Sequence, residues 1–500
     1  MLSGVVLVWR TVHGPFQLGS VPVTSPLNAQ SVFGLSATIL LIGTRRRAAS
    51  TQAHARYEIL WLSAILLLTL ATLWPAVGLP LVFDDYTLAE EGHVVTPATV
   101  AYHFTHAGGD GFFRPVGYLS LGLDARWAGR DPFRWHIVGL LLHLANIVLV
   151  WRLAGCLAGD CVAALWATTL FAIHGTVLLT PMYLAARFDV LAVFFVLAGL
   201  ISFQQYLRTN RLSLLALGVA SSVLGMLTKE TAFVFPLLAI LVSGSKVRSH
   251  AQAIAGFFGA AALVFIYRYS LLGGLGGYRD PVTGSPQVLD ASLLGYLKGF
   301  ALRIWSAFYF PMNWSHEPEP WLVGLLLAYL AALVWICVCT SASRGRLLAM
   351  LAFIVVALLP LAHLLLVDAS LLGAGRFYLA LVGSAMMLGI TLRDTPRPGQ
   401  LLAGLILVLF QVGALRHNLA IWSATSRLVE QTCVAAGEIS GNGRALVVAG
   451  LPREIDGVPF LGTNNGFGAC VRFYGRAVPI TSRAPALRWD SRTRSLVPQD

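Results

Sequence analysis

Residues 136–155 read HIVGLLLHLANIVLVWRLAG, and this stretch decides the class of fold. Arg152, near its end, is the one side chain among Asp, Glu, Lys and Arg that it contains. A helix of about 20 apolar residues matches the roughly 30 Å hydrocarbon core of a bilayer. The stretch therefore predicts a helix that spans a membrane.

Similar apolar runs extend on both sides of this one. They cover residues 57–82, 161–179, 188–207, 211–228, 230–244, 251–272, 321–340, 347–367, 371–391 and 400–422. Residues 31–44 are also apolar but short for a span, so the sequence leaves their placement open. We therefore predict an all-α polytopic membrane protein with about 11–12 transmembrane helices.

The composition of the whole chain agrees with this class. Hydrophobic residues make up 57% of it and charged residues only 12%, which is far more apolar than a soluble domain. The formal charge of +12 comes from 35 basic and 23 acidic residues, an excess that a nucleic-acid binder would gather in one polar patch. Here the basic residues lie mostly in short loops, so we expect membrane lipids as partners and no nucleic acid.

The basic loops also predict the topology, because Arg and Lys mark cytoplasmic loops. They fall on alternate loops, at Arg45–Arg47 with Arg56, Arg152, Arg208 with Arg211, Lys246 with Arg248, Arg344 with Arg346, and Arg393 with Arg397. The external side then carries the long loop 83–135, the turn at 180–188, the stretch 273–320 and everything after about residue 424.

We expect three parts along the chain. Residues 1–56 form an N-terminal segment without signal-peptide features, which we expect to remain attached. Residues 57–423 form the transmembrane domain, including the loop 83–135. In residues 424–500 short apolar runs alternate with turns, which predicts a small β-containing external module.

Cysteines and clustered aromatics are expected to be structural. Cys337 and Cys339 lie in an apolar run and should pack there. Cys433 and Cys470 both fall in the C-terminal module, and whether they pair depends on whether it faces an oxidising compartment. An interfacial aromatic belt is favoured over a groove for lipid or sugar for five residues: Trp305, Phe308, Tyr309, Phe310 and Trp314.

The long external loop begins with two neighbouring carboxylates, Asp84 and Asp85, directly after an apolar run. Adjacent acids repel each other and raise one pKa, which suits one of them to act as a general base or to bind a cation. The alternative is a hydrated helix end with two ordinary surface acids. A divalent metal would need more ligands than these two carboxylates supply, so no metal is assigned.

Other charged residues occur inside or at the external ends of apolar runs, where each needs a partner or a wet cavity. Local charge compensation or interfacial snorkelling is the alternative for Arg187 with Asp189 and for Lys229 with Glu230. Arg376 has no acidic neighbour in sequence, which indicates an external anion or a distant partner.

Two histidines and one loop arginine complete the set of candidates. His143 and His174 lie in apolar helical context, where a hydrogen-bonded core histidine is the alternative to a functional one. Arg114 precedes Pro115 in the long loop, and an interfacial turn explains it equally well. Because the topology puts the acids and cations on one face, a shared cavity would suit glycosyl transfer from a lipid-phosphate sugar.

Several motifs occur in an order similar to that of the GT-C superfamily of membrane glycosyltransferases. The closest resemblance is to TPR-containing transmembrane O-mannosyltransferases and their bacterial relatives. The motifs are Phe83-Asp84-Asp85-Tyr86, Phe113-Arg114-Pro115-Val116, Trp135-His136-Ile137-Val138, Leu142-His143-Leu144-Ala145-Asn146, Leu170-Phe171-Ala172-Ile173-His174, Ala186-Arg187-Phe188-Asp189, Leu227-Thr228-Lys229-Glu230 and Gly375-Arg376-Phe377-Tyr378-Leu379.

The resemblance implies an inverting transfer of a sugar from a polyprenyl-phosphate donor to a hydroxyl acceptor on a protein, lipid or glycan. Asp84 would be the base, with Asp85 assisting, and three cations would hold the departing phosphate: Arg187, Lys229 and Arg376. Six other side chains would line the substrate cavity: Arg114, His143, His174, Asp189, Glu230 and Tyr378. The implied location is the plasma membrane of a bacterium, with the site on the periplasmic side.

The chain also departs from the family pattern. The family usually has Pro, a second His and Glu after His174, whereas this chain has Gly175, Val177 and Leu179. The position before Arg376 is often Glu in the family and is Gly375 here. No 34-residue helical repeat follows residue 424, so the acceptor must be recognised differently.

Two other classes of function remain open at this point. Charges within apolar runs also mark the substrate pathways of lipid or polysaccharide transporters and flippases, although such proteins usually show internal repeats. A non-catalytic relative that assists envelope assembly is the third reading. The long acid-bearing external loop favours the enzyme.

Overall fold

The computed structural model describes residues 2–18, 21–23, 26–43, 55–108, 111–277, 292–365, 371–439, 448–461, 464–474 and 487–498. The helices of the first half are α1 (Leu2–His13), α2 (Leu27–Gly43), α3 (Ala55–Val77), α4 (Asp85–Val94), α5 (Val100–Thr105), α6 (Pro115–Ala128), α7 (Pro132–Ala158), α8 (Cys161–Ala172), α9 (Leu179–Met182), α10 (Arg187–Thr209), α11 (Leu212–Met226), α12 (Phe235–Ser243) and α13 (Ala251–Leu272).

The helices of the second half are α14 (Leu293–Leu302), α15 (Ile304–Tyr309), α16 (Pro320–Cys339), α17 (Arg344–Leu358), α18 (Leu371–Gly375), α19 (Tyr378–Arg393), α20 (Arg397–Ile439) and α21 (Asn464–Phe473). Short 3-10 turns connect several of them: η1 (Gly175–Leu178), η2 (Leu184–Ala186), η3 (Glu230–Val234), η4 (Gly244–Lys246), η5 (Arg248–His250) and η7 (Leu359–Leu364).

The strands are short and pair in three small sheets. An antiparallel hairpin near the N-terminus joins β1 (Phe16–Leu18) to β2 (Val21–Val23). A second hairpin joins β4 (Glu454–Ile455) to β5 (Val458–Pro459). In the third sheet β6 (Leu487–Asp490) lies between β3 (Val448–Ala449), which is parallel to it, and β7 (Ser495–Pro498), which is antiparallel.

The helical membrane protein predicted from the apolar runs is confirmed. Among the described residues seven helices are long and apolar enough to cross a membrane, or eight if the bent pair α8 and α9 is one span. This is fewer than the expected 11–12, because four other apolar helices have only 10–17 residues. One of these lies in α2, where the sequence left the placement open.

Local signals explain where the spanning helices begin and end. The Asp131 side chain accepts a hydrogen bond from the backbone N–H of Phe133 and caps α7, whose first residue is a proline. Gly159 ends α7 in the left-handed conformation. Asp160 follows at once and caps α8 through the N–H of Ala163. Two antiparallel helices are thereby joined by two residues.

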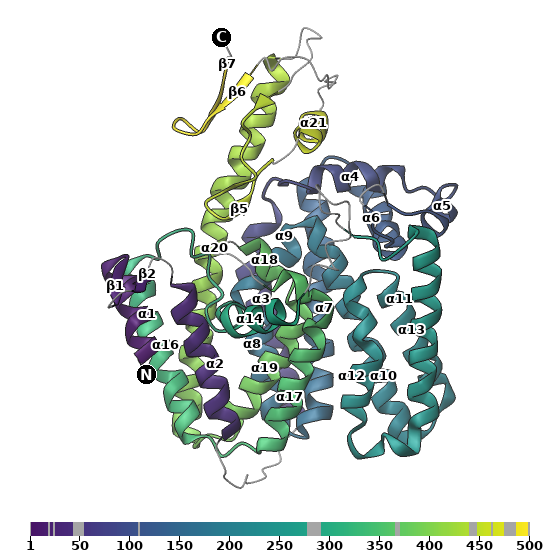
Figure 1. The fold of residues 1–500 in the computed structure, drawn as a ribbon, viewed down its shortest axis with the longest axis vertical. Helices are drawn as coiled ribbons and strands as arrows, with labels where there is room; N and C mark the ends of the chain where they lie inside the picture. The colour runs from purple at the N-terminus through teal and green to yellow at the C-terminus, as the bar shows by residue number, and fades with distance from the viewer. Residues whose placement is uncertain are drawn as a thin grey trace.

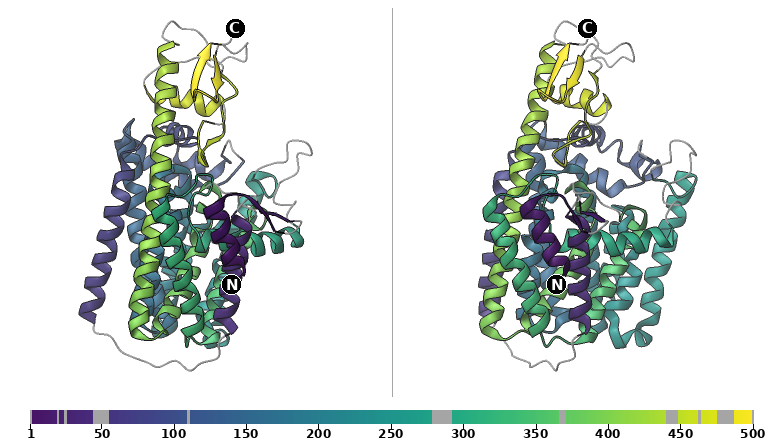
Figure 2. Two further views of the ribbon diagram at one scale, coloured as in Figure 1. Left: turned by 90° about the vertical axis from the view of Figure 1, so that its left-hand side faces the viewer. Right: turned by 60° about the vertical axis from the view of Figure 1, so that its left-hand side comes forward.

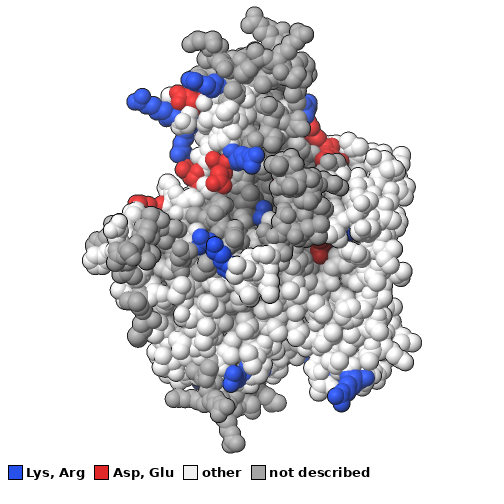
Figure 3. Space-filling view, in the orientation of Figure 1, with Lys and Arg blue, Asp and Glu red and all other residues white. Residues whose placement is uncertain are grey.

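The two ends of the helical bundle differ. Figure 1 shows α4, α5 and α6 at the same end as α21 and the strands β6 and β7. Charged side chains of both signs gather at that end on the face drawn in Figure 3, basic ones mark the opposite end, and the broad band between them carries few. This distribution is the one expected of a protein that crosses a bilayer.

The long helix α20 connects the bundle to the C-terminal module. Its 43 residues would extend about 65 Å, roughly twice the hydrocarbon thickness. It therefore projects well beyond the bundle, and β6, β7 and α21 lie beside its far end (Figure 2). The boundary expected at residue 424 falls inside this continuous helix.

Two structural expectations for the second half have different outcomes. Cys337 is a buried packing residue whose thiol approaches the carbonyl of Ala37. The aromatic belt expected around residues 305–314 is wrong for four of its five members. Trp305, Phe308, Tyr309 and Phe310 are at most 2% exposed, because α15 packs against α2 inside the bundle instead of facing lipid.

The topology predicts which loops reach each side of the membrane. We expect the variant Ala98→Cys, which adds one cysteine beside α5, to react with a membrane-impermeant maleimide on intact cells. Ser213→Cys, at the start of α11 beside Arg211, should react only after permeabilisation. Both residues are exposed, so accessibility does not separate them. The unsubstituted protein measures labelling of the natural free thiols, and equal labelling of both variants on intact cells would contradict the topology.

Candidate functional site

The two acids of the Phe83-Asp84-Asp85-Tyr86 motif have different environments. Asp85 is completely buried, and its carboxylate accepts hydrogen bonds from the backbone N–H groups of Leu184 at 2.7 Å and Val82 at 3.3 Å. Burial raises the pKa of Asp85 well above its ordinary value, against the lowering effect of these N–H groups. Asp85 thus joins the start of α4 to the segment 179–186.

Asp84 is the member of the pair that is accessible. It is half-buried, and its carboxylate accepts a hydrogen bond from the Tyr183 hydroxyl at 3.4 Å. The residue before it, Phe83, has φ +47°, a left-handed conformation that costs a non-glycine residue about 1–2 kcal/mol. Such strain at a candidate site persists only where the surroundings hold it.

A break in the α8–α9 span brings the segment 179–186 to this position. The two helices meet at an angle of 53° around His174 and Gly175. A Cβ at Gly175 would lie 2.1 Å from the Pro311 carbonyl oxygen, so only glycine fits there. Gln411 accepts a hydrogen bond from the Gly175 N–H and Asn418 donates one to its carbonyl, which satisfies the freed backbone groups.

Asp84 and the residue before Arg376 both approach the segment 179–186. A Cβ at Gly375 would lie 2.5 Å from Leu179 Cδ1, while Tyr183 reaches Asp84. Leu179 and Tyr183 are joined by a backbone hydrogen bond and are one helical turn, about 6 Å, apart. Within the segment 179–186, Tyr183 thus contacts Asp84, and Leu179 lies against Gly375, the residue before Arg376.

Arg376 differs from the other predicted cations. It is half-buried between α18 and α19, and within the described part of the chain no carboxylate forms an ion pair with it. The expectation of an anion or distant partner for Arg376 therefore stays a prediction.

The remaining predicted charges form a network next to this turn, among α6, α10, η3 and α13. Arg187 pairs with Asp124 and also donates to the Trp135 carbonyl at 3.2 Å. Lys229 Nζ lies 2.6 Å from the Asp189 carboxylate. Burial lowers the pKa of Lys229 although Asp189 opposes this shift.

Glu230 is shared by two arginines. Its carboxylate accepts from Arg114 at 2.8 Å and from Arg268 at 3.1 Å. Burial alone would raise the pKa of Glu230, but the two guanidinium groups outweigh it and hold this pKa at about 2. Arg114 also lies over the Phe112 ring, with 3.9 Å between its Cζ and the ring centroid.

The observed ion pairs rule out local charge compensation between residues that are neighbours in sequence. Arg187 does not pair with Asp189, and Lys229 does not pair with Glu230. Adjacent residues, and residues two apart on a helix, point in different directions, so each charge finds its partner on another element.

Sequence reasoning missed two members of the network, Asp124 and Arg268. The signal for Arg268 was present, because an arginine inside the apolar run 251–272 requires a partner. Asp124 belongs to α6, a helix within the stretch 83–135 that was predicted only as a long external loop.

The histidines and Tyr378 are buried in the bundle. Tyr378 donates its hydroxyl hydrogen to His143 Nδ1 at 2.7 Å, while His143 Nε2 donates to the Ala172 carbonyl at 3.0 Å. His174 is bonded at both ring nitrogens, to the Thr176 hydroxyl and the Phe308 carbonyl. Among the described residues no group of three or more His, Cys, Asp and Glu side chains is arranged to hold a metal ion.

The structure therefore defines an integral helical membrane protein with an accessible acid, a buried anchoring acid and a cation network at one end of the bundle. No protein-family model matches the chain. Over 159 residues it is 30% identical to protein O-mannosyl-transferase tmtc2 of Xenopus laevis, a match that covers 30% of this chain and 18% of that protein.

Two further relatives are also named protein O-mannosyl-transferases. Protein O-mannosyl-transferase Tmtc1 of Drosophila melanogaster is 28% identical over 132 residues, covering 26% of this chain and 15% of that protein. Protein O-mannosyl-transferase TMTC2 of Mus musculus is 31% identical over 106 residues, covering 21% and 13%. The predicted resemblance to transmembrane O-mannosyltransferases is confirmed for this part of the chain, which spans less than a fifth of the length of these curated relatives.

The chain also aligns over most of its length with a solved structure. The crystal structure of ArnT from Cupriavidus metallidurans bound to undecaprenyl phosphate aligns with 86% of each chain, at 14% sequence identity and a TM-score of 0.38.

The shared carboxylate of Glu230 predicts a measurable loss of stability. Glu230→Gln should leave Arg114 and Arg268 without their counter-ion, at a cost of about 3 kcal/mol. We expect a lower melting temperature in detergent than for Glu317→Gln, an exposed control. Because the pKa of Glu230 is about 2 in the folded protein and ordinarily 4.5, this contribution is present above about pH 4.5 and disappears as the pH falls towards 2. Equal melting temperatures at pH 7 would contradict the assignment.

Proposed function

We propose that this protein is an inverting glycosyltransferase that moves a sugar from a polyprenyl-phosphate donor to a hydroxyl acceptor at the external face of a bacterial plasma membrane. The observation that carries the proposal is the accessible carboxylate of Asp84, which contacts the segment 179–186. The residue before Arg376 approaches the same segment, and the cation network begins at Arg187, directly after it. The names of the relatives that match part of the chain support the reaction class and favour a mannosyl-like donor.

In this reaction Asp84 acts as the general base. It takes the proton of the acceptor hydroxyl while the acceptor oxygen forms a bond to the anomeric carbon. The bond between that carbon and the phosphate oxygen breaks, and its electron pair leaves with the polyprenyl phosphate. Attack on the face opposite the leaving group inverts the anomeric configuration.

Asp85 has a supporting role in the proposal. Both of its carboxylate oxygens are engaged by backbone N–H groups, and the residue is inaccessible. It therefore orients the turn that carries Asp84 and does not contact substrate.

The cations would stabilise the leaving phosphate. Arg376 is the direct ligand in this proposal. The network contributes an excess of charge, because its four basic side chains face three acidic ones and leave one net positive charge. Fixed cations in a water-poor site stabilise a developing phosphate charge strongly. Arg187 and Lys229 act here through the network, since each already has an acidic partner.

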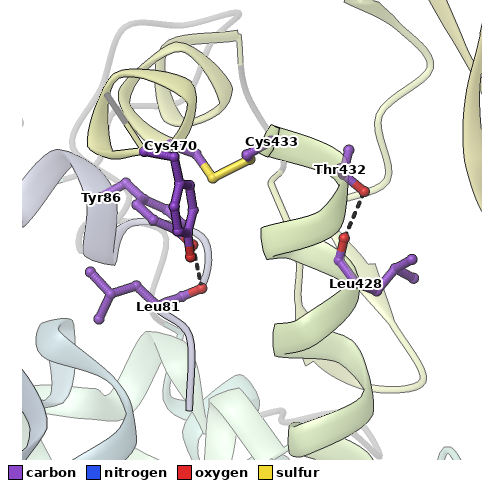
Figure 4. The surroundings of a disulfide bond; sticks show 7 residues. Leu81, Tyr86, Leu428, Thr432, Cys433 and Cys470 are labelled. Atoms are coloured by element: carbon purple, nitrogen blue, oxygen red, sulfur yellow. Dashed lines mark hydrogen bonds between the residues drawn. A yellow bond between two sulfur atoms is a disulfide. The ribbon is translucent and has the colours of Figure 1, made fainter. Parts of the chain in front are cut away.

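The disulfide supports the external location. Cys433 and Cys470, which the sequence left open, are joined, and their Cα atoms lie 5.9 Å apart. Figure 4 shows this bond beside Tyr86, one residue after Asp85. Disulfides persist in oxidising compartments such as the periplasm, which supports the proposal that the end of the bundle that carries Asp84 faces that side.

Replacing the proposed base predicts a specific loss. Asp84→Asn should lower transfer from polyprenyl-phosphate mannose by about 10²–10⁴-fold, because it keeps the size of the side chain and removes the proton acceptor. Glu91→Gln on the same helix should keep full activity. Mass spectrometry of envelope glycans and glycoproteins with and without the protein identifies the acceptor for this assay. Unchanged transfer by a folded Asp84→Asn protein would rule out the base role.

The phosphate ligand is tested separately. Arg376→Gln should raise the donor KM by about tenfold or more, because a charge-assisted contact to phosphate is lost, and Arg376→Lys should retain part of it. Arg397→Gln at the opposite end of the bundle is the control. If labelled donor instead crosses proteoliposome membranes without sugar transfer, the transporter reading replaces the enzyme.

A further inference from the structure

The strained turn before Asp84 is held by the C-terminal part of the chain. The backbone N–H of Phe83 donates a hydrogen bond to the Phe460 carbonyl at 2.7 Å. Phe460 is completely buried, and its own N–H donates to the Arg453 carbonyl at 2.8 Å. A contact between residues almost four hundred positions apart thus fixes the residue next to the proposed base.

Phe460 directly follows the β4–β5 hairpin, which is rigid by its own geometry. Its two turn residues, Asp456 and Gly457, have φ of +51° and +72°. Positive φ at both central positions is the property of a type I′ turn, the tightest connection of two antiparallel strands. The hairpin therefore presents the Phe460 carbonyl from a well-defined position.

The hairpin is also fixed to the bundle. Asn313 donates a hydrogen bond to the Asp456 carbonyl at 2.6 Å, and the Asn313 N–H donates to Asn418 of α20 at 2.8 Å. Strand β5 packs against α20 and against α18, the helix that ends one residue before Arg376. The hairpin thus contacts both sides of the proposed site.

Helix α21 holds α4 from the other direction. Arg472 forms two hydrogen bonds with the Glu90 carboxylate, at 2.7 and 2.9 Å. The rings of Tyr86 and Phe473 pack edge to face with 5.4 Å between centroids. The disulfide from Cys470 fastens α21 to α20 (Figure 4).

We propose that the hairpin with its following residue (Glu454–Phe460) and α21 (Asn464–Phe473) form a clamp that positions Asp84, with the Phe460 backbone as its positioning group and the Cys433–Cys470 disulfide as its fastening. The proposal rests on the proposed function of Asp84. It assigns the C-terminal module a part in the reaction without any contact to substrate.

Two hydrogen bonds fix the backbone on either side of Asp84: the one from Leu184 to the Asp85 carboxylate and the one from the Phe83 N–H to the Phe460 carbonyl. Asp85 sets the position of the turn along the segment 179–186, and the clamp sets the backbone conformation of Phe83 and therefore the direction in which the Asp84 side chain leaves the chain. A misplacement of about 1 Å in a reacting group costs about 100-fold in rate. Loosening the clamp should consequently lower kcat and leave the donor KM, which depends on cations elsewhere, largely unchanged.

The test unfastens the clamp in the full-length protein. Cys433→Ala with Cys470→Ala is compared with a matched double removal of free thiols, Cys156→Ala with Cys161→Ala. Hydrogen–deuterium exchange of the peptide covering residues 79–94 is measured, with peptides of α10 as internal reference. We expect exchange at residues 82–85 to rise about tenfold, and kcat to fall about 10- to 100-fold, in the first variant only.

A rescue experiment separates positioning from general destabilisation. Asn adopts the left-handed conformation far more readily than other non-glycine residues. In the unfastened background Phe83→Asn should restore part of kcat, whereas Phe83→Leu, which loses the same aromatic ring, should not. If the double-alanine protein fails to fold, Arg472→Gln is used in its place, because it removes the link to α4 and keeps the disulfide.

The possible outcomes are decisive. Unchanged exchange at residues 82–85, or raised exchange with unchanged kcat, overturns the clamp. Failure of Phe83→Asn to restore any activity lost also overturns it, since the backbone conformation would then not be what the clamp supplies. If the unsubstituted protein transfers no sugar, the proposed function fails. This failure can be told apart from failure of the clamp, because hydrogen–deuterium exchange tests the clamp without any assay of transfer.

Discussion

The buried carboxylate of Asp85 is the interaction on which the proposed site depends. An acid in this position is costly unless backbone donors satisfy it, and those donors come from Val82 beside it and Leu184 about a hundred residues later. The second donor exists because the α8–α9 span breaks and directs residues 179–186 to this position. The burial of Asp85 therefore depends on the break between α8 and α9. Asp84, the residue before Asp85, is the acid that stays accessible.

The charged side chains around α6 meet the same requirement, that a buried charge must have a partner. Each charge that enters an apolar helix bundle must find a partner, and the partners found here come from other elements. Asp124 serves Arg187, Asp189 serves Lys229, and two arginines share Glu230. The network joins α6, α10, η3 and α13 and retains one excess positive charge. A phosphate would meet a fixed field that requires no rearrangement on binding.

Sequence alone predicted the long apolar helices, because the thickness of the bilayer sets the length of each apolar run. The side of the membrane on which the candidates lie stays a prediction from loop charge. Sequence could not predict partners. Lys229 and Glu230 are neighbours in sequence, but Lys229 pairs with Asp189 and Glu230 pairs with two arginines. The pKa of Glu230 falls to about 2 only because Arg114 and Arg268 reach it from other parts of the chain. The hydrogen bond from Phe83 to Phe460 has no signal in composition or periodicity, since it joins two backbone groups.

Two of the departures from the family pattern, at positions 179 and 375, lie against each other. Leu179 stands where the family usually has Glu and is 1% exposed, and a Cβ at position 375 would lie 2.5 Å from its Cδ1. Glycine at 375, where the family often has Glu, thus gives Leu179 its space. Neither Leu179 nor Gly375 brings an acidic side chain to the neighbourhood of Arg376. The physical consequence is a more positive surrounding for Arg376, which favours an anionic ligand and disfavours the binding of an extra cation.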